Sequence, residues 1–391
     1  MHIIQTLDTI DPQGLVQFPA DKYLLDAKAA TPSAIMVRSS DLHTRDFPAT
    51  LKAVGRAGVG VNNIPLAKLT ELGIPVFYTP GANANAVKEL VLAGMLLATR
   101  NLYPALEFVR QLKAPADQFD AAMEQQKKQF RGSELAGKTL GVIGLGQIGV
   151  KVANAALALG MKVIGFDPSM TLHNALALSS EIRKVENLSE LLTASQFISL
   201  HVPLLENTRH FLKAEELALL KPETILLNFS RGEIVDLDAV IGALNNKKLR
   251  CYVTDFPTPE LQKHPAAICL PHLGASTAEA EQNSAYILVN HLRDFLEYGY
   301  IKHSANFPDV HLPPGAAFRL VVINKNIPGM VAQISELLSR TGHNIITMLN
   351  KSRENVAYNL IDMDTSVDEK SLLDLSALPG IIRAYNLAPL S

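Results

Sequence analysis

The sequence predicts an α/β protein with two doubly wound parallel sheets and a smaller antiparallel module at its C-terminal end. Over the first 300 residues, short apolar runs alternate with helical segments. A glycine-rich turn joins one of these runs to a helix near residue 144, and the segment after residue 317 has the element order βαββαβ. The chain has 391 residues, too many for one ordinary core, so several domains are expected.

The composition is that of a globular protein. Hydrophobic residues make up 48% of the chain and charged residues 19%, and the formal net charge is −2. This balance argues against a nucleic-acid or membrane-surface partner. Cys251 and Cys269 match no metal-site spacing, so we expect no metal and a reducing, cytoplasmic compartment. We see no signal peptide, and the most apolar stretch, 90–99, is too short to span a bilayer.

The first domain is predicted from three buried-strand runs at 34–37, 51–54 and 74–77. Strands separated by helical segments favour a parallel sheet with helices on both faces. Ligands bind beyond the carboxyl ends of such strands. Residues that follow the three runs, such as Arg38, are therefore the candidates for substrate contacts.

A helix over 84–101 and a polar segment at 124–129 precede the second α/β unit. Its expected elements are strands at 138–143, 162–166, 197–200 and 224–227, a strand ending before Asp255, and a helix over 277–298. A proline-bearing linker is expected over 303–317. The predicted boundaries are 1–96 with 288–310 for the substrate domain, 97–287 for the nucleotide domain and 318–391 for the last module.

The C-terminal module is predicted to be ferredoxin-like. A strand at 318–323 leads to a helix that opens at Pro328-Gly329, with apolar residues at helical spacing. Strands follow at 344–348 and 356–363, then a short helix at 371–375 and a strand at 381–385.

The glycine-rich turn Gly144-x-Gly146-x-x-Gly149 follows an apolar strand and opens a helix. The first glycine permits the tight turn, the second lets the backbone approach a pyrophosphate, and the third lets helix and strand pack closely. The helix N-terminus offers free N–H groups to the phosphates. The alternative is a glycine turn that serves packing alone.

Asp167 favours the nucleotide interpretation because it ends the next strand, where a carboxylate can accept hydrogen bonds from the adenosine ribose. This anion would repel a 2′-phosphate, so NAD is expected rather than NADP. The alternative is that Asp167, which precedes Pro168, is only a turn residue.

Arg231, Glu260 and His272 are the candidate catalytic residues. An imidazole suits the removal of a hydroxyl proton, and a carboxylate can orient it. A guanidinium forms a planar fork for a substrate carboxylate. Each of these residues alone would more often be structural, but all three follow a predicted nucleotide-binding turn. Together they indicate hydride transfer on a 2-hydroxy acid.

The chain resembles the D-isomer-specific 2-hydroxyacid dehydrogenases, in which Arg, Glu and His stand in this order. The resemblance rests on the strings at 37–40, 54–63, 79–83, 134–138 and 271–277 and covers nearly the whole chain. It implies a flavodoxin-like substrate domain, a Rossmann nucleotide domain and a phosphorylated 2-hydroxy acid as substrate. Asn62, Leu261 and Lys88 depart from the usual family pattern.

The resemblance also implies site residues. Cofactor contacts are expected at Val59, Gly144, Gly146, Gln147, Ile148, Gly149, Asp167, Val202, Phe229, Ser230, Arg231, Asp255, His272, Gly274 and Ala275. Substrate contacts are expected at Arg38, Ser39, Gly60, Asn83 and Arg231. Asp255 would hold the nicotinamide carboxamide, and Arg38 would meet the substrate phosphate.

The C-terminal module resembles an ACT domain, a small regulatory module that binds amino acids. This resemblance implies serine as the effector, held by Asn324, Asn326 and Asn344. The alternative is that these asparagines are turn residues. A homotetramer is also implied by the resemblance.

Two other functions remain open from the sequence. The same chemistry could act on glyoxylate, hydroxypyruvate or 2-oxoglutarate, since only the pocket near Arg38, Asn62 and Asn83 decides which substrate is bound. The chain could also be a nucleotide-sensing binding protein on this fold. The complete set of Arg231, Glu260 and His272 argues against that interpretation, because a sensor needs no base.

Overall fold

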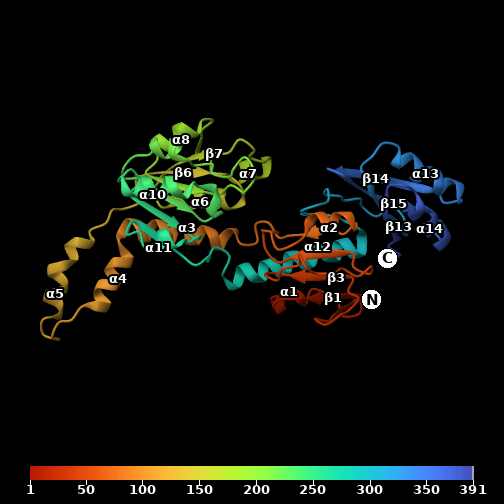
Figure 1. Cartoon of the computed structure of the whole chain (residues 1–391), viewed down its shortest axis with the longest axis horizontal. Coiled ribbons are helices and arrows are strands. Elements are labelled where there is room, and N and C mark those ends of the chain that lie inside the picture. The colour runs from red at the N-terminus through yellow and green to blue at the C-terminus, as the bar shows by residue number, and fades with distance from the viewer. Residues whose placement is uncertain (390–391) are drawn as a thin grey trace. The chain divides into compact units, whose positions relative to one another are not determined.

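The computed structural model describes residues 1–389 and divides into two compact units (Figure 1). The first contains Met1–Asn83 and Ala278–Ser391, and the second contains Ala84–Thr277. Three sheets make up the framework, two of them parallel and one antiparallel.

The first unit contains a five-stranded sheet in the order β2-β1-β3-β4-β5. Every adjacent pair is parallel. This order is the flavodoxin-like one, so the expected fold of this domain is confirmed. The strands are β1 (His2–Thr6), β2 (Tyr23–Leu25), β3 (Ala34–Val37), β4 (Ala53–Arg56) and β5 (Val76–Phe77). The expectation of strands at 51–54 and 74–77 placed the starts of β4 and β5 two residues too early.

Helices cover this sheet. They are α1 (Pro12–Leu15), α2 (Leu66–Glu71) and the long α12 (Ala278–Tyr298). Two glycines allow close approach to α12: a Cβ at Gly14 would lie 2.4 Å from the Ala285 side chain, and one at Gly55 would lie 2.6 Å from that of Leu288. Leu288, Leu292 and Phe295 of α12 are buried in the core of this unit.

The second unit contains a seven-stranded parallel sheet in the order β12-β11-β10-β9-β6-β7-β8. The switch between β6 and β9 gives the Rossmann arrangement that was expected. The strands are β6 (Thr139–Ile143), β7 (Lys162–Phe166), β8 (Arg183–Lys184), β9 (Phe197–Leu200), β10 (Ile225–Asn228), β11 (Cys251–Thr254) and β12 (Ala267–Cys269). The central strands are buried along their whole length, as a sheet covered on both faces requires.

The helices of this unit are α3 (Ala84–Arg100), α4 (Leu102–Gln111), α5 (Phe119–Gln126), η1 (Lys127–Phe130), α6 (Gln147–Ala158), α7 (Leu172–Ala177), α8 (Leu188–Ala194), α9 (Ala214–Ala218), η2 (Gly232–Ile234), α10 (Leu237–Asn245) and α11 (Pro259–Gln262). Helices α4 and α5 project from the rest of the unit (Figure 1). The sequence indicated only a polar segment at 124–129, so this pair of helices was not foreseen.

The C-terminal module has the predicted element order. Its strands are β13 (Phe318–Lys325), β14 (Ile345–Arg353), β15 (Val356–Met363) and β16 (Ile381–Asn386), and its helices are α13 (Met330–Arg340) and α14 (Glu369–Ala377). The four strands form an antiparallel sheet in the order β14-β15-β13-β16. One face packs on α13 and α14 around Leu320, Ile334 and Leu375.

The other face of this sheet packs within the first unit. Val321, Ile323 and Tyr358 share one hydrophobic core with Phe295 of α12 and Phe77 of β5. The Tyr358 hydroxyl donates a hydrogen bond of 2.9 Å to the Gly299 carbonyl. The module therefore belongs to the first compact unit.

The compact units divide after Asn83 and after Thr277, whereas the sequence predicted divisions at 96/97 and 287/288. Packing explains both differences. The whole of helix α3 belongs to the second unit, where Gly94 lies against the side chains of Phe229 and Val253. Helix α12 continues without a break through residues 287 and 288.

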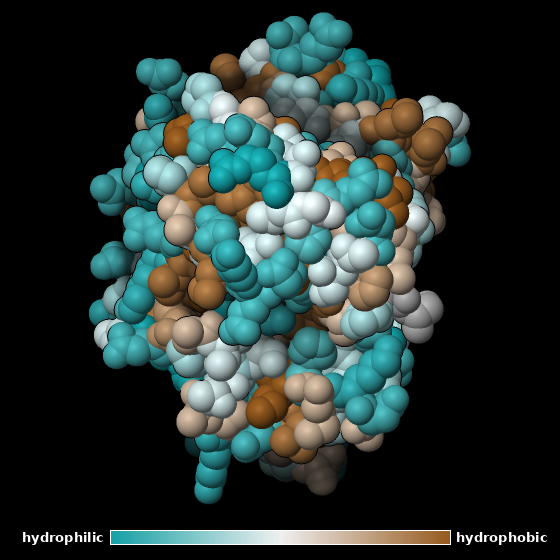
Figure 2. Space-filling view, turned by 90° about the vertical axis from the view of Figure 1, so that its right-hand side faces the viewer, coloured by the Kyte–Doolittle hydropathy of each residue, from teal (hydrophilic) through white to brown (hydrophobic). Residues whose placement is uncertain are grey.

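In residues 1–389, no helix is both long enough and apolar enough to cross a lipid bilayer. Cys251 and Cys269 are free thiols. Figure 2 shows one face of the molecule, on which hydrophobic residues lie in small groups between hydrophilic ones. Scattered groups of this kind are usual on a globular protein.

Candidate active site

The glycine turn after β6 has the three environments that a pyrophosphate-binding turn requires. Gly144 has a φ of 91°, and a Cβ there would lie 2.7 Å from the His201 carbonyl. A Cβ at Gly149 would lie 1.9 Å from the Gly144 oxygen, so helix and turn approach too closely for any side chain. A Cβ at Gly146, the residue before α6, would meet nothing within 4 Å. The turn is thus crowded on the protein side and open where a pyrophosphate would lie.

Asp167 follows β7 and faces this turn. Its Oδ2 accepts a hydrogen bond of 2.8 Å from the Leu145 N–H, and its Oδ1 accepts one of 2.8 Å from the Ser169 N–H. Each carboxylate oxygen can accept a second hydrogen bond, so the group can still receive ribose hydroxyls. The residues present therefore fit a dinucleotide with a free 2′-hydroxyl.

Arg231 is presented by a turn that Asn228 organises. The Asn228 amide is fully buried at the end of β10. Its Nδ2 donates a hydrogen bond of 2.8 Å to the Arg231 carbonyl, and its Oδ1 accepts one of 3.1 Å from the Ser230 N–H. The Ser230 hydroxyl donates to the Val202 carbonyl and thereby joins the ends of β9 and β10. The Arg231 guanidinium donates 2.7 Å to the Ser230 carbonyl and is only partly buried.

His272 lies on a loop that Asp255 holds. Asp255 is 1% exposed at the end of β11, and its two oxygens accept hydrogen bonds of 2.7 Å each from the N–H groups of Leu273 and Gly274. His272 has a φ of 53°, a left-handed conformation that is uncommon outside glycine. The ring of Phe256 packs against the His272 imidazole, with centroids 5.0 Å apart. The imidazole itself is exposed.

The expected hydrogen bond between Glu260 and His272 is absent from the part of the chain that the structure describes. Glu260 lies in the first turn of α11. Hydrogen bonding from its own backbone N–H and from the Thr258 hydroxyl lowers the pKa of the Glu260 carboxyl. A helix N-terminus favours a negative side chain in this way. Catalytic hydrogen bonds often tighten only when substrate binds, so the orienting role stays a prediction.

The other expected cofactor residues differ in exposure. Val59, Gln147 and Ala275 are exposed, while Ile148 and Val202 are partly buried. Phe229 is 6% exposed and its ring is part of the nucleotide-domain core. Only the backbone of Phe229 can therefore meet a cofactor.

The substrate-side candidates lie in the first unit, and Asp8 organises them. Oδ2 of Asp8 accepts hydrogen bonds from the N–H groups of Arg38, Ser39 and Ser40, at 2.6, 2.9 and 3.1 Å. Burial raises the pKa of the Asp8 carboxyl, but the bonds from Arg38 and Ser40 outweigh this and lower it overall. Sequence reasoning missed Asp8 because it did not predict β1, whose carboxyl end places this residue beside β3.

Asn83 and Thr79 lie in the loop after β5. The Asn83 Oδ1 and the Thr79 Oγ1 are buried, and neither has a hydrogen-bond partner in residues 1–389. Buried polar atoms without partners are uncommon in folded proteins, so these two oxygens are free to form hydrogen bonds with a ligand or with water. Gly60 lies at the neighbouring edge, after β4.

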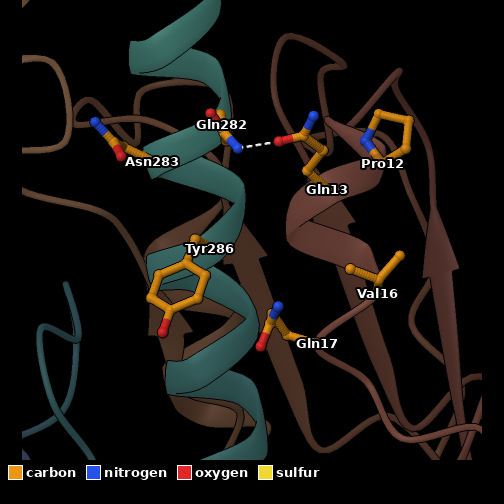
Figure 3. Close-up of a pocket in the computed structure, with 7 residues that line it drawn as sticks. All are labelled: Pro12, Gln13, Val16, Gln17, Gln282, Asn283 and Tyr286. Atoms are coloured by element: carbon orange, nitrogen blue, oxygen red, sulfur yellow. Dashed lines mark hydrogen bonds between the residues drawn. The ribbon is translucent and has the colours of Figure 1, made fainter.

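A separate open pocket of about 640 Å³ lies between α1 and α12 (Figure 3). Gln13 and Gln282 face each other across it and are joined by a hydrogen bond. The remaining lining residues are Pro12, Val16, Gln17, Asn283 and Tyr286. This pocket contains no carboxylate, imidazole, guanidinium or thiol. Within residues 1–389, no group of three or more His, Cys, Asp or Glu side chains is arranged to hold a metal ion.

Comparison with known proteins agrees with this geometry. Residues 92–274 match the family described as D-isomer specific 2-hydroxyacid dehydrogenase, NAD binding domain. D-3-phosphoglycerate dehydrogenase of Escherichia coli is 34% identical over 85% of this chain and 81% of its own length. The enzyme of that name from Haemophilus influenzae is 31% identical over 97% and 93%.

Other relatives are named for different activities. Hydroxypyruvate reductase of Thermotoga maritima is 37% identical over 68% of this chain and 84% of its own length. Among solved structures, a glyoxylate reductase from Paecilomyes thermophila is 25% identical, with a TM-score of 0.64, over 78% of this chain and 98% of that one. The structure of D-2-hydroxyisocaproate dehydrogenase, with a TM-score of 0.64 at 24% identity, shows the same fold.

Proposed function

Because the chain belongs to the D-isomer-specific 2-hydroxyacid dehydrogenase family and is thus an NAD-binding oxidoreductase, we propose that it oxidises D-3-phosphoglycerate to 3-phosphohydroxypyruvate. This reaction opens the phosphorylated route to L-serine. The observation that supports the proposal best is that Arg231 and His272 follow β10 and β12 of the same parallel sheet whose strand β6 leads into the open glycine turn. The similarity to D-3-phosphoglycerate dehydrogenases over 85–97% of the chain supports the choice of substrate.

The chemistry follows from the residues. Bound NAD would accept the hydride that leaves C2 of the substrate. The His272 imidazole takes the proton of the C2 hydroxyl, and Glu260 stabilises the resulting imidazolium if its side chain turns toward the ring. Arg231 pairs with the substrate carboxylate through two N–H groups and fixes the orientation of C2. Arg38, Ser39, Gly60 and Asn83 receive the phosphorylated end.

A direct assay tests this function. Purified protein with NAD and D-3-phosphoglycerate should produce NADH, and His272→Ala should lower kcat by about 10²–10⁴-fold. NADH binding, measured by calorimetry, should persist in this variant because the glycine turn and Asp167 are untouched. An absence of turnover with 2-hydroxy acids of any kind would contradict the proposal, and retained turnover in the variant would remove His272 as the base.

Reduction of hydroxypyruvate is the second candidate. The relative from Thermotoga maritima is a hydroxypyruvate reductase, and the candidate phosphate ligand Arg38 already forms an ion pair of 2.7 Å with Glu281. An occupied arginine favours an uncharged substrate end. Comparing phosphohydroxypyruvate with hydroxypyruvate as substrates for NADH oxidation decides between the two candidates.

We further propose that the C-terminal module is an ACT domain that binds serine. Asn326 and Asn344 have exposed positions on either side of α13, which suits a small polar ligand. Asn324 is 2% exposed. Its Oδ1 accepts a hydrogen bond of 2.7 Å from the Asn359 amide, and its Nδ2 donates one of 2.7 Å to the Lys325 carbonyl. Asn324 would therefore support the strand rather than touch the effector. Turnover measured with millimolar serine tests this regulation, and unchanged rates would contradict it.

A cytoplasmic homotetramer is proposed as the working form. The exposed apolar residues of the projecting helix α4, Leu102, Tyr103, Leu106 and Val109, support self-association. Two free cysteines are compatible with a reducing compartment.

A further inference from the structure

The side chain of Arg38 is already paired with a carboxylate. Its Nη2 donates a hydrogen bond of 2.7 Å to Oε1 of Glu281, and the two side chains are 36% and 41% exposed. Glu281 lies in the first turn of α12. A helix N-terminus favours a negative side chain, so this position suits an ionised Glu281.

The surroundings of this ion pair contain a second carboxylate. Asp8 binds the backbone of residues 38–40 through three N–H groups and also accepts 2.7 Å from the Ser40 hydroxyl. The segment that carries Arg38 therefore has one carboxylate, Asp8, at its backbone and another, Glu281, at its side chain. A phosphate dianion that approaches Arg38 must either displace Glu281 or accept repulsion from it.

An uncharged hydroxyl group meets different conditions at the same place. It can donate a hydrogen bond to the Glu281 carboxylate and accept one from the Arg38 guanidinium, since a hydroxyl is both donor and acceptor. Neither charge of the ion pair needs to lose its partner. The ion pair thus treats a hydroxymethyl end and a phosphorylated end of a substrate unequally.

We propose that Glu281 is a specificity-determining residue that weakens binding of a dianionic substrate end at Arg38 and favours an uncharged, hydroxyl-bearing one. The inference rests on the proposed function, because it requires that Arg38 meets the end of a 2-hydroxy or 2-oxo acid that lies away from the carboxylate. It applies whichever of the two candidate substrates the enzyme uses by nature.

The test compares 3-phosphohydroxypyruvate with hydroxypyruvate in NADH-dependent reduction by wild type and Glu281→Gln. Glutamine keeps the size of glutamate and one acceptor oxygen but removes its charge. The KM for the phosphorylated substrate should fall by about three- to tenfold in the variant, because partial exposure screens the repulsion. The KM for hydroxypyruvate should rise or stay the same, and kcat should change little with either substrate.

Glu279→Gln is the matched control. Glu279 lies in the same first turn of α12 and is exposed, but no salt bridge joins it to Arg38 in the described residues. Its removal should leave the ratio of the two KM values unchanged. The effect of Glu281→Gln should also shrink as salt is added, since exposed charges are screened.

The outcomes separate this inference from the proposed function. If wild type reduces neither substrate, the proposed function fails. If wild type is active but Glu281→Gln leaves the KM ratio unchanged, or alters both KM values equally while its melting temperature matches wild type, the ion pair has no role in specificity and the inference is overturned. If Glu279→Gln changes the KM ratio as much as Glu281→Gln does, the effect comes from the net charge at the helix end. That outcome also overturns the inference.

Discussion

The Oδ1 of Asp255 accepts a hydrogen bond of 2.7 Å from the backbone N–H of Leu273, the residue that directly follows His272. Its Oδ2 accepts an equally short bond from Gly274. Asp255 is almost fully buried, so both bonds are shielded from water. The resemblance implies that this carboxylate holds the nicotinamide carboxamide, which stays a prediction. The structure shows that the carboxylate fixes the loop of the proposed base.

Asp255→Asn should therefore lower activity and stability together. The new amide NH₂ would point at a backbone N–H, which leaves two donors facing each other in a buried site. We expect a loss of about 1.5–3 kcal/mol in unfolding free energy, the usual contribution of hydrogen bonds to a charged group. A displaced His272 should lower kcat by roughly 10-fold or more. Urea unfolding and NADH-dependent turnover measure the two effects.

Asp238→Asn is the control for this substitution, because Asp238 is an exposed residue in the first turn of α10. It should change unfolding free energy by less than about 0.5 kcal/mol. If Asp255→Asn keeps wild-type turnover, the loop does not depend on this carboxylate.

Much of the active-site framework was predictable because local sequence determines it. The glycine turn follows β6 and precedes α6 as the spacing predicted, and Asp167 directly follows β7. Long apolar runs such as 197–200 also became buried strands. These features depend on backbone geometry and burial, which a single sequence expresses directly.

Long-range partners were not predictable from local pattern. Asp8 and Arg38 meet only because β1 and β3 pair in the sheet, and Glu281 reaches Arg38 from a helix 243 residues further on. The helix pair α4 and α5 has no buried residue, so its apolar positions gave no core signal. The environment of Glu260 was not predictable either, because it depends on the first turn of a short helix, α11, that the sequence did not indicate.

Acidification should destabilise the fold through His291. This residue of α12 is 6% exposed, and burial lowers its pKa to about 4. The positive charges of His303 and Lys302 add to this shift, while the backbone of Tyr78 opposes it. Since the folded state holds the neutral form, stability is full above the unfolded value of 6.5 and is lost as pH falls from there toward 4. The loss attributable to His291 should be about 2–3 kcal/mol.

His291→Gln separates this contribution from other titrating groups. The variant should unfold more easily than wild type near neutral pH, yet its stability should fall less steeply as pH drops from 6.5 toward 4. Urea midpoints across this range measure the difference in slope. Parallel curves for the two proteins would mean that His291 does not drive the acid sensitivity.

Self-association should depend on helix α4. Tyr103 and Leu106 are 64% and 57% exposed, and no residue of this helix is buried. Leu106→Lys places a charge in this apolar stripe and should shift the protein to a smaller assembly, because a buried unpaired charge disfavours association. Light scattering coupled to size exclusion measures the mass. Glu107→Gln, at the exposed neighbouring position, should keep the wild-type mass, and an unchanged mass for Leu106→Lys would place the interface elsewhere.

The buried ion pair between Arg319 and Asp362 should be the most sensitive point of the C-terminal module. The Arg319 guanidinium contacts both oxygens of Asp362, at 2.6 and 3.0 Å, and neither side chain is exposed to solvent. Arg319 also donates 3.0 Å to the Tyr298 carbonyl and 3.3 Å to that of Pro313. One residue of β13 thus ties β15, the end of α12 and the linker together.

Arg319→Met should therefore cost about 3–5 kcal/mol of unfolding free energy, because Asp362 is left as an unpaired buried charge. The linker over 303–317 should also become easier to cleave by protease. The double variant Arg319→Met/Asp362→Asn removes both charges and should recover part of the loss, which a double-mutant cycle measures. If the double variant loses as much unfolding free energy as the two single variants together, each residue contributes through separate contacts. The charges at β13 and β15 then do not act as a unit.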